Sequence, residues 1–269
     1  MKRLLLIIAV TFLVLPACEK EITIDVEDAP QQLVIEGVLN NYLGESYILI
    51  SKSVNLYGGT NFEKVSGASV SVEDEAGIVY VFNEESGTPG RYVLPTFQAL
   101  PNTTYDLMVT VDGETITSTS TSPSIPKLDS LPYLVNPPAG FGQEDSTYFL
   151  FYVFTDDVTQ ENYYRVRPEI NGDLDNNFYI GNDQLGNGEQ VQAPFFATPL
   201  VVGDSNNIKV TLSSFDEANY TYLFSWANAA DQSPFSAVPS NPVTNLEGSE
   251  NVVGYFGAFM LDTMTLYLP

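Results

Sequence analysis

The sequence predicts a mainly β protein built from tandem β-sandwich-like domains, the second of which carries one amphipathic helix. From position 32 onward, short segments alternate apolar and polar residues, which is the period of a half-buried strand. Turn residues such as Gly, Asn and Pro separate most of these segments. Only the stretch near 214–230 spaces its apolar residues as a helix does. Many short strands with regular turns favour sandwiches.

The first seventeen residues are organised like a signal peptide. A short positive segment at 1–3 precedes an apolar run over 4–15. A run of about a dozen residues is too short to cross about 30 Å of hydrocarbon, so a transmembrane anchor is not expected. The run ends in Leu-Pro-Ala-Cys at 15–18, which resembles a bacterial lipobox. We therefore expect cleavage after residue 17.

Cys18 is the only cysteine of the chain, so no disulfide is available. A lone free thiol would be a liability in an exported protein, whereas a lipidated one is an anchor. Acyl chains contribute about 0.8 kcal/mol per buried CH₂. We expect lipid on Cys18, residues 18–31 as a tether, and attachment to the outer membrane. Whether the anchor faces the periplasm or the medium stays open.

The charge of the mature chain is strongly negative. Loss of Lys2 and Arg3 leaves 8 basic residues against 34 acidic ones, a formal charge of −26. Such a surface repels nucleic acid and anionic headgroups. Solubility explains the acidic excess, and cation binding is the alternative.

The first domain is expected over 32–125. Its predicted strands are 33–39, 47–54, 68–74, 78–83, 90–94, 104–111 and 114–120. The pieces at 67–80, 90–92 and 100–107 follow the order of the carboxypeptidase-regulatory, transthyretin-like module, which they resemble. That resemblance implies a small immunoglobulin-like sandwich.

A Ser/Thr/Pro-rich passage suggests a domain border near 123–127, and the second domain is expected over 126–269. The segment 125–131 could pair with the edge of this domain. Its predicted strands are 147–155, buried on both faces, and 163–170, 178–180, 209–212 and 263–267. In the helix near 214–230 we expect Trp226 to pack on a sheet, with ligand stacking as the alternative.

The closing segments 241–248, 252–259 and 263–267, the early strand at 33–39 and the lipobox resemble an uncharacterised Bacteroidota lipoprotein family, catalogued as domain of unknown function 4249. The shared motifs are structural and imply no residue-level mechanism. Because members are often encoded near TonB-dependent outer-membrane receptors, the resemblance implies an accessory role in nutrient uptake.

The chain has no histidine, which excludes Ser-His-Asp and Cys-His catalysis and histidine-based zinc sites. It also lacks glycine loops of the P-loop or dinucleotide type. Carboxylates remain, and a glycosidase needs only two at the right separation. No pair stands out, so we expect no enzyme.

Four aspartates are weak candidates for a calcium site because hard cations prefer oxygen ligands. They are Asp156, Asp157, Asp173 and Asp175. The last two begin like an EF-hand loop, but the required glycine is replaced by Phe178 and the required glutamate by Gln184. A solvated turn is the alternative, and no cofactor is otherwise expected.

Four loop aromatics are weak candidates for ligand binding, with loop packing as the alternative. They are Tyr133, Phe141, Phe178 and Tyr179. The sequence thus favours a non-catalytic binding lipoprotein that assists a TonB-dependent receptor. A glycan-binding or adhesive surface module is the alternative, and a carboxylate-based glycosidase is a third hypothesis.

Overall fold

Strands make up most of the described chain, which confirms the mainly β prediction. The computed structural model describes residues 31–54, 61–138, 145–184, 186–195, 200–230 and 241–269. Cys18 and Phe141 lie outside these ranges. The strands of the first half are β1 (Leu33–Asn40), β2 (Tyr47–Lys52), β3 (Ser69–Asp74), β4 (Val79–Glu84), β5 (Arg91–Val93), β6 (Thr104–Val111) and β7 (Glu114–Thr121). Those of the second half are β8 (Leu128–Ser130), β9 (Tyr133–Asn136), β10 (Thr147–Thr155), β11 (Tyr163–Ile170), β12 (Asp173–Leu174), β13 (Tyr179–Asn182), β14 (Gln190–Pro194), β15 (Leu200–Val201), β16 (Asn206–Phe215) and β17 (Val252–Leu268).

Two sheets contain these strands. The larger sheet runs in the order β12-β11-β16-β17-β1-β2-β5-β4-β3-β6-β7, and β13 pairs with β11. The smaller sheet is organised around β10, which pairs with β14, β15, β8 and β9. Pairing of β8 with β10 confirms that the segment after the Pro-rich passage joins a strand of the second half.

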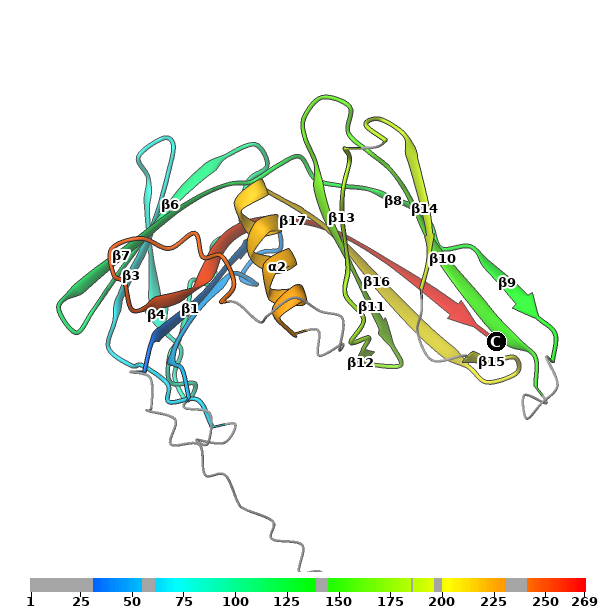
Figure 1. The fold of residues 1–269 in the computed structure, drawn as a ribbon, viewed down its shortest axis with the longest axis horizontal. Coiled ribbons are helices and arrows are strands. Elements are labelled where there is room, and N and C mark those ends of the chain that lie inside the picture. The colour runs from blue at the N-terminus through cyan, green and yellow to red at the C-terminus, as the bar shows by residue number, and fades with distance from the viewer. Residues whose placement is uncertain (1–30, 55–60, 139–144, 185, 196–199, 231–240) are drawn as a thin grey trace, which may run out of the picture. The chain divides into compact units, whose positions relative to one another are not determined.

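The 17-residue strand β17 connects the two predicted domains (Figure 1). It pairs parallel to β1, with Val34 opposite Val253, and antiparallel to β16, with Val210 opposite Met264. The sequence predicted a strand only at 263–267, whereas β17 also includes the closing segment 252–259 and the residues between the two. Residues Gln31–Pro269 belong to one compact unit. Whether the halves 32–125 and 126–269 can fold separately stays a prediction.

A glycine allows β17 to lie against β1. Gly254 has a φ of +114°, and a Cβ atom there would lie 2.0 Å from the carbonyl oxygen of Ile35. No other residue type combines this backbone conformation with so close an approach.

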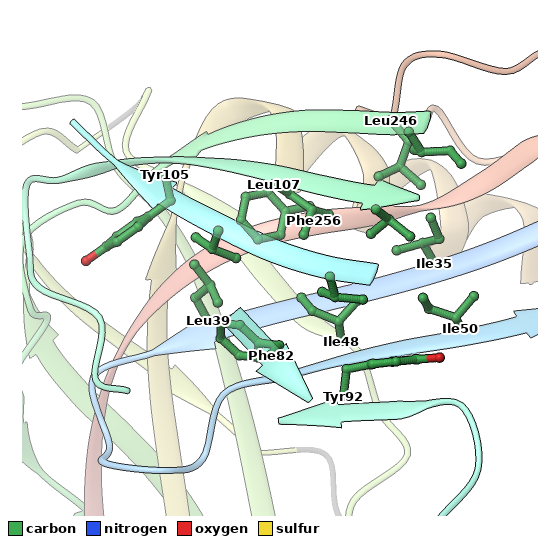
Figure 2. Packing of buried hydrophobic residues seen from close by; sticks show 14 of the residues in the cluster. Ile35, Leu39, Ile48, Ile50, Phe82, Tyr92, Tyr105, Leu107, Leu246 and Phe256 are labelled. Carbon is green, nitrogen blue, oxygen red and sulfur yellow. The ribbon is translucent and has the colours of Figure 1, made fainter. Parts of the chain in front are cut away.

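The interior of the first half is filled by apolar side chains of β1–β7 and β17. Ile35, Ile48 and Phe256 are completely buried, as the alternation of each strand requires. Figure 2 shows these side chains packed with Phe82 and Leu107. Burial of a large apolar side chain stabilises a fold by about 1.5–3 kcal/mol, so this cluster is a principal source of stability.

The second half has its own core between β10 of the smaller sheet and β11 and β16 of the larger one. Along β10 every residue except Thr155 is buried or half-buried, which confirms the prediction for this strand. On β11, Tyr164 and Val166 point into this core, whereas Arg165 and Arg167 project to the opposite face because side chains alternate along a strand.

The helix α2 (Glu217–Ala230) confirms the predicted helix, although it starts three residues later than 214 because β16 extends to Phe215. Asp216 caps it by accepting a hydrogen bond from the backbone N–H of Asn219 at 2.9 Å. α2 packs against β17 and β11.

The predicted apolar face of α2 is partly wrong. Ala218, one of the apolar residues at helical spacing, is exposed. Trp226 is 45% exposed, and its ring meets Phe178 beside β13 at 5.5 Å. The buried positions are Leu223 and the polar Asn219, whose amide donates to the carbonyl of Phe256 at 3.1 Å. A hydrophobic pattern cannot predict this orientation because a hydrogen-bonded asparagine helps to set it.

Candidate functional site

A pocket of about 300 Å³ lies between the two sheets of the second half. Its lining residues come from strands β10, β11, β13 and β14 and from the segments next to them. Figure 1 shows where these four strands lie in the second half. Its lining is mainly aromatic and aliphatic, with a few polar groups: Tyr152, Phe154, Asp156, Tyr164, Val166, Tyr179, Ile180, Gly181, Asn182, Asp183, Gly186 and Val191. Ligand sites in proteins are concave and mostly apolar with few polar groups, and this pocket lies at the small end of their usual range.

A buried carboxylate sits in the wall of this pocket. Asp156 is only 6% exposed and follows directly on β10. Its Oδ1 accepts a hydrogen bond from the Tyr164 hydroxyl at 2.7 Å, and its Oδ2 accepts one from the Gly188 N–H at 2.7 Å. Burial and the Asp156 carboxylate both raise the pKa of Tyr164, so its hydroxyl stays protonated and remains a donor. Each carboxylate oxygen keeps a further lone pair, which can accept from a ligand.

Aromatic rings make the apolar part of the lining. Phe154 meets Tyr164 at a centroid distance of 4.7 Å, and Tyr152 stacks near Phe154 at 6.3 Å with an angle of 12°. Burial raises the pKa of Tyr152, whose hydroxyl makes no hydrogen bond within the part of the chain that the structure describes. This hydroxyl is a polar group that a ligand can satisfy.

The turn after Asp156 is fixed by hydrogen bonds. Asp157 accepts from the side chain of Thr159 at 2.6 Å and from the Ser124 hydroxyl at 2.7 Å. These side-chain hydrogen bonds lower the pKa of Asp157. The rim of the pocket is thereby attached to the segment that links the two halves.

The four aspartates named as calcium candidates serve different roles in the structure. Asp156 and Asp157 hold the hydrogen bonds just described, and Asp175 accepts from the Tyr179 hydroxyl at 2.8 Å. Asp173 is exposed on β12. Within the described ranges, no three acidic, histidine or cysteine residues gather as a metal site. Calcium binding therefore stays a prediction.

The aromatic candidates are separated by the fold. Tyr179 lines the pocket and meets Phe195 at 5.9 Å. Phe178 belongs to the other face of β11, where the Arg165 guanidinium lies 4.7 Å from its ring centre. Tyr133 is 43% exposed on β9 and contacts Tyr148 edge-on. Of the predicted ligand residues, the pocket therefore contains one, together with the predicted metal ligand Asp156.

Sequence reasoning did not identify Tyr152 and Tyr164. Both occupy inward positions of strongly apolar strands, where a tyrosine is expected to be core. Their one distinguishing signal is the hydroxyl, because a buried tyrosine needs a partner for it. Tyr164 has such a partner in Asp156, and Tyr152 has none among the described residues.

A larger hollow of about 700 Å³ lies over β3, β6, β7 and the segment 244–247. It contains Glu73, Asp106 and Glu247, all of them exposed. The carboxyl group that acts as general acid in a glycosidase is usually kept protonated by an apolar environment. These three side chains lack such an environment. The pocket beside β10 is therefore the better candidate site.

None of the described helices is long and apolar enough to span a bilayer.

Fold and pocket together define a mainly β protein with a ligand-sized aromatic pocket between two sheets. The model of a family described as "Domain of unknown function (DUF4249)" matches residues 19–264, and the chain therefore belongs to this family. No curated protein matches the sequence.

Proposed function

We propose that this protein is a non-catalytic binding protein that holds a small, largely apolar ligand in the pocket between β10 and β11. Lipid on Cys18 would anchor it in the outer membrane, where it acts as the accessory partner of a TonB-dependent nutrient receptor.

The pocket supports the binding part of this proposal. Its aromatic lining suits a flat or aliphatic body, and the buried Asp156 suits a hydroxyl or amine donor on the ligand. The Tyr152 hydroxyl can donate to an acceptor on the same ligand. Because the chain has no histidine, and because Tyr164 and Gly188 already hold Asp156, the site favours binding over acid–base chemistry.

The anchor and the accessory role are supported by the lipobox at 15–18 and by the resemblance to lipoproteins encoded beside such receptors. Their test is a mild-detergent pulldown of the C-terminally tagged chain from its native membranes, with mass spectrometry of proteins and small molecules. A receptor recovered in stoichiometric amount supports the accessory role. Recovery of the lipoprotein alone contradicts it.

The same preparation tests lipidation. Cys18→Ser should abolish incorporation of a labelled fatty acid into the protein, because the thiol that carries the acyl chain is gone. Labelling that persists in the variant would contradict the anchor. A glycan array read with the wild-type protein should give no signal, and a specific signal would favour the adhesive module instead.

A further inference from the structure

Two adjacent arginines lie on the face of β11 that points away from the pocket. Arg165 pairs across the sheet with Ser213, and Arg167 pairs with Thr211. Because they are two residues apart on one strand, their side chains leave the same face side by side. This face is covered in part by α2 and by the aromatic cluster that includes Phe178, Tyr222 and Tyr255.

Neither arginine has an acidic partner within the part of the chain that the structure describes. The chain has 34 acidic and 10 basic residues, so an unpaired cation is unexpected. The ion pairs among the described residues are Lys52–Glu63, Arg91–Glu85 and Lys209–Glu169. Glu169 follows Arg167 on the same face of β11, yet it pairs with Lys209 at 3.4 Å.

Arg165 is half-buried, which makes its lack of a counter-ion costly. Its guanidinium lies 4.7 Å from the ring centre of Phe178, and ring contact replaces only part of the lost hydration. Burial and the neighbouring charge of Arg167 lower the pKa of Arg165 to about 10. An anion placed between the two arginines would relieve both effects.

Aromatic side chains surround this position. Tyr222 and Tyr255 meet at a centroid distance of 4.7 Å, and Phe178 meets Trp226 at 5.5 Å. The charges of Arg165, Arg167 and Arg91 all act on the hydroxyl of Tyr47 and oppose the rise of its pKa through burial and Glu36. The contact of Arg165 with the Phe178 ring places a cationic group and the rings on one surface.

A groove of about 550 Å³ lies on the Arg167 side of this face. Arg167 and Lys209 line it, together with the hydroxyl-bearing Thr211 and Thr263. Glu45 and Glu169 line the same groove, so repulsion disfavours a ligand with several negative charges. A single carboxylate is the anion that best fits two forked guanidinium groups in acidic surroundings.

We propose that Arg165 and Arg167 form a recognition site for a monocarboxylate with a flat apolar body. The guanidinium groups hold the carboxylate, and the rings around Phe178 and Tyr255 pack against the body. The site lies on the opposite face of β11 from the pocket of the proposed function and is independent of it.

Trp226 provides the readout, since it is the only tryptophan of the chain and touches Phe178. The full-length protein in mild detergent is titrated with phenylacetate while Trp226 emission is recorded. Phenylacetamide, the neutral analogue, is the matched ligand control. We expect a saturable response to phenylacetate, and binding of the amide at least about tenfold weaker because a charge-assisted hydrogen bond is lost.

Arg165→Gln and Arg167→Gln should each weaken phenylacetate binding by about tenfold or more. Lys52→Gln, which removes an equal charge from an ion pair elsewhere, should leave binding unchanged. Without ligand, Arg165→Gln should keep or raise the melting temperature, because an unpaired half-buried charge is removed. A structural arginine would instead lower it.

This proposal would be overturned if millimolar phenylacetate gave no saturable response, or if phenylacetate and phenylacetamide bound with equal affinity. It would also be overturned if both arginine variants bound phenylacetate as tightly as the wild type does. Gly181→Phe, which fills the pocket on the other face, must leave phenylacetate binding intact. Loss of phenylacetate binding in this variant would assign the carboxylate to the pocket and contradict the arginine site. Failure of the pocket proposal alone leaves these outcomes unaffected.

Discussion

The interior of the first half is filled with apolar side chains, whereas the interior of the second half retains a pocket with a buried carboxylate in its wall. Ile48 and Phe256 are fully buried against apolar neighbours in the first half. In the second half, Phe154 is as well buried but has the pocket on one side. Both interiors are bounded by the same twelve-stranded sheet.

The two interiors differ in how well their packing stabilises the fold. A filled interior maximises dispersion contacts and apolar burial, which stabilise the protein. An interior with a cavity loses part of these contacts, and a buried polar group adds a desolvation cost. The proposed binding role would account for a region that keeps both features.

The largest expected effect on the free energy of unfolding comes from replacing a buried phenylalanine in each half. Phe82 is 2% exposed in the filled core and Phe154 is 3% exposed in the pocket wall. Phe82→Ala should lower the free energy of unfolding by about 3–5 kcal/mol. Phe154→Ala should cost less, since its ring has fewer contacts to lose. Urea unfolding measures both, and an equal or larger loss at Phe154 would break the comparison.

The next largest effect is expected at Gly254, where β17 lies against β1. Gly254→Ala should lower the free energy of unfolding by more than the roughly 1–3 kcal/mol of a strained backbone, because Cβ also meets the Ile35 carbonyl. Gly203→Ala is the matched control, since Gly203 has a φ of +101° but open space around it. Equal losses in thermal unfolding would show that the close approach is unimportant.

A smaller effect sharpens the role of the buried carboxylate. Tyr164→Phe leaves Asp156 without one of its donors and should lower the free energy of unfolding by about 1–3 kcal/mol. Tyr152→Phe removes a hydroxyl that has no described partner, so it should change stability by less than about 0.5 kcal/mol. Chemical denaturation of the pair checks this. Reversal of the order would contradict the hydrogen-bond assignment.

The smallest effect concerns pH, where the two halves should behave alike. Hydrogen bonds from Thr159 and Ser124 lower the pKa of Asp157, and those from Ile78, Tyr80 and Ala76 lower the pKa of Asp74. A folded-state pKa below the unfolded value of about 3.9 contributes stability above that pH, and the contribution is lost as pH falls through the folded pKa.

Asp157→Asn and Asp74→Asn should therefore each make the melting temperature fall less steeply below about pH 4. The wild type, measured in the same buffers, is the reference. A steeper fall in either variant would contradict a folded-state pKa that lies below the unfolded value.

Local patterns predicted most strands of this fold, but they could not predict the pairing. Strands at 147–155 and 163–170 appear with the predicted bounds because their apolar and aromatic runs are strong. The parallel pairing of β1 with β17 joins segments more than two hundred residues apart, and nothing in either segment specifies the other. The helix was predicted from its spacing, yet Asn219 was not predicted as buried.

Fewer residues of the candidate pocket than of the fold could be predicted from the sequence. Asp156 and Tyr179 were candidates because of their chemistry, and both line the pocket. Tyr152 and Tyr164 looked like core, since strand periodicity gives the face of a residue but not the distance to the opposite sheet. The unpaired state of Arg165 and Arg167 depends on where Glu169 and Lys209 meet, which is a tertiary property.

The measurement that tests the central claim most directly is a ligand-observed NMR screen of small apolar alcohols and amines against three forms of the full-length protein. The forms are the wild type, Gly181→Ala and Gly181→Phe. Gly181 lines the pocket opposite Tyr164, and a Cβ there meets no atom within 4 Å. If the pocket is the binding site, ligands bind the wild type and the alanine variant and fail to bind the phenylalanine variant. Binding that survives Gly181→Phe, or no binding to any form, would contradict the account.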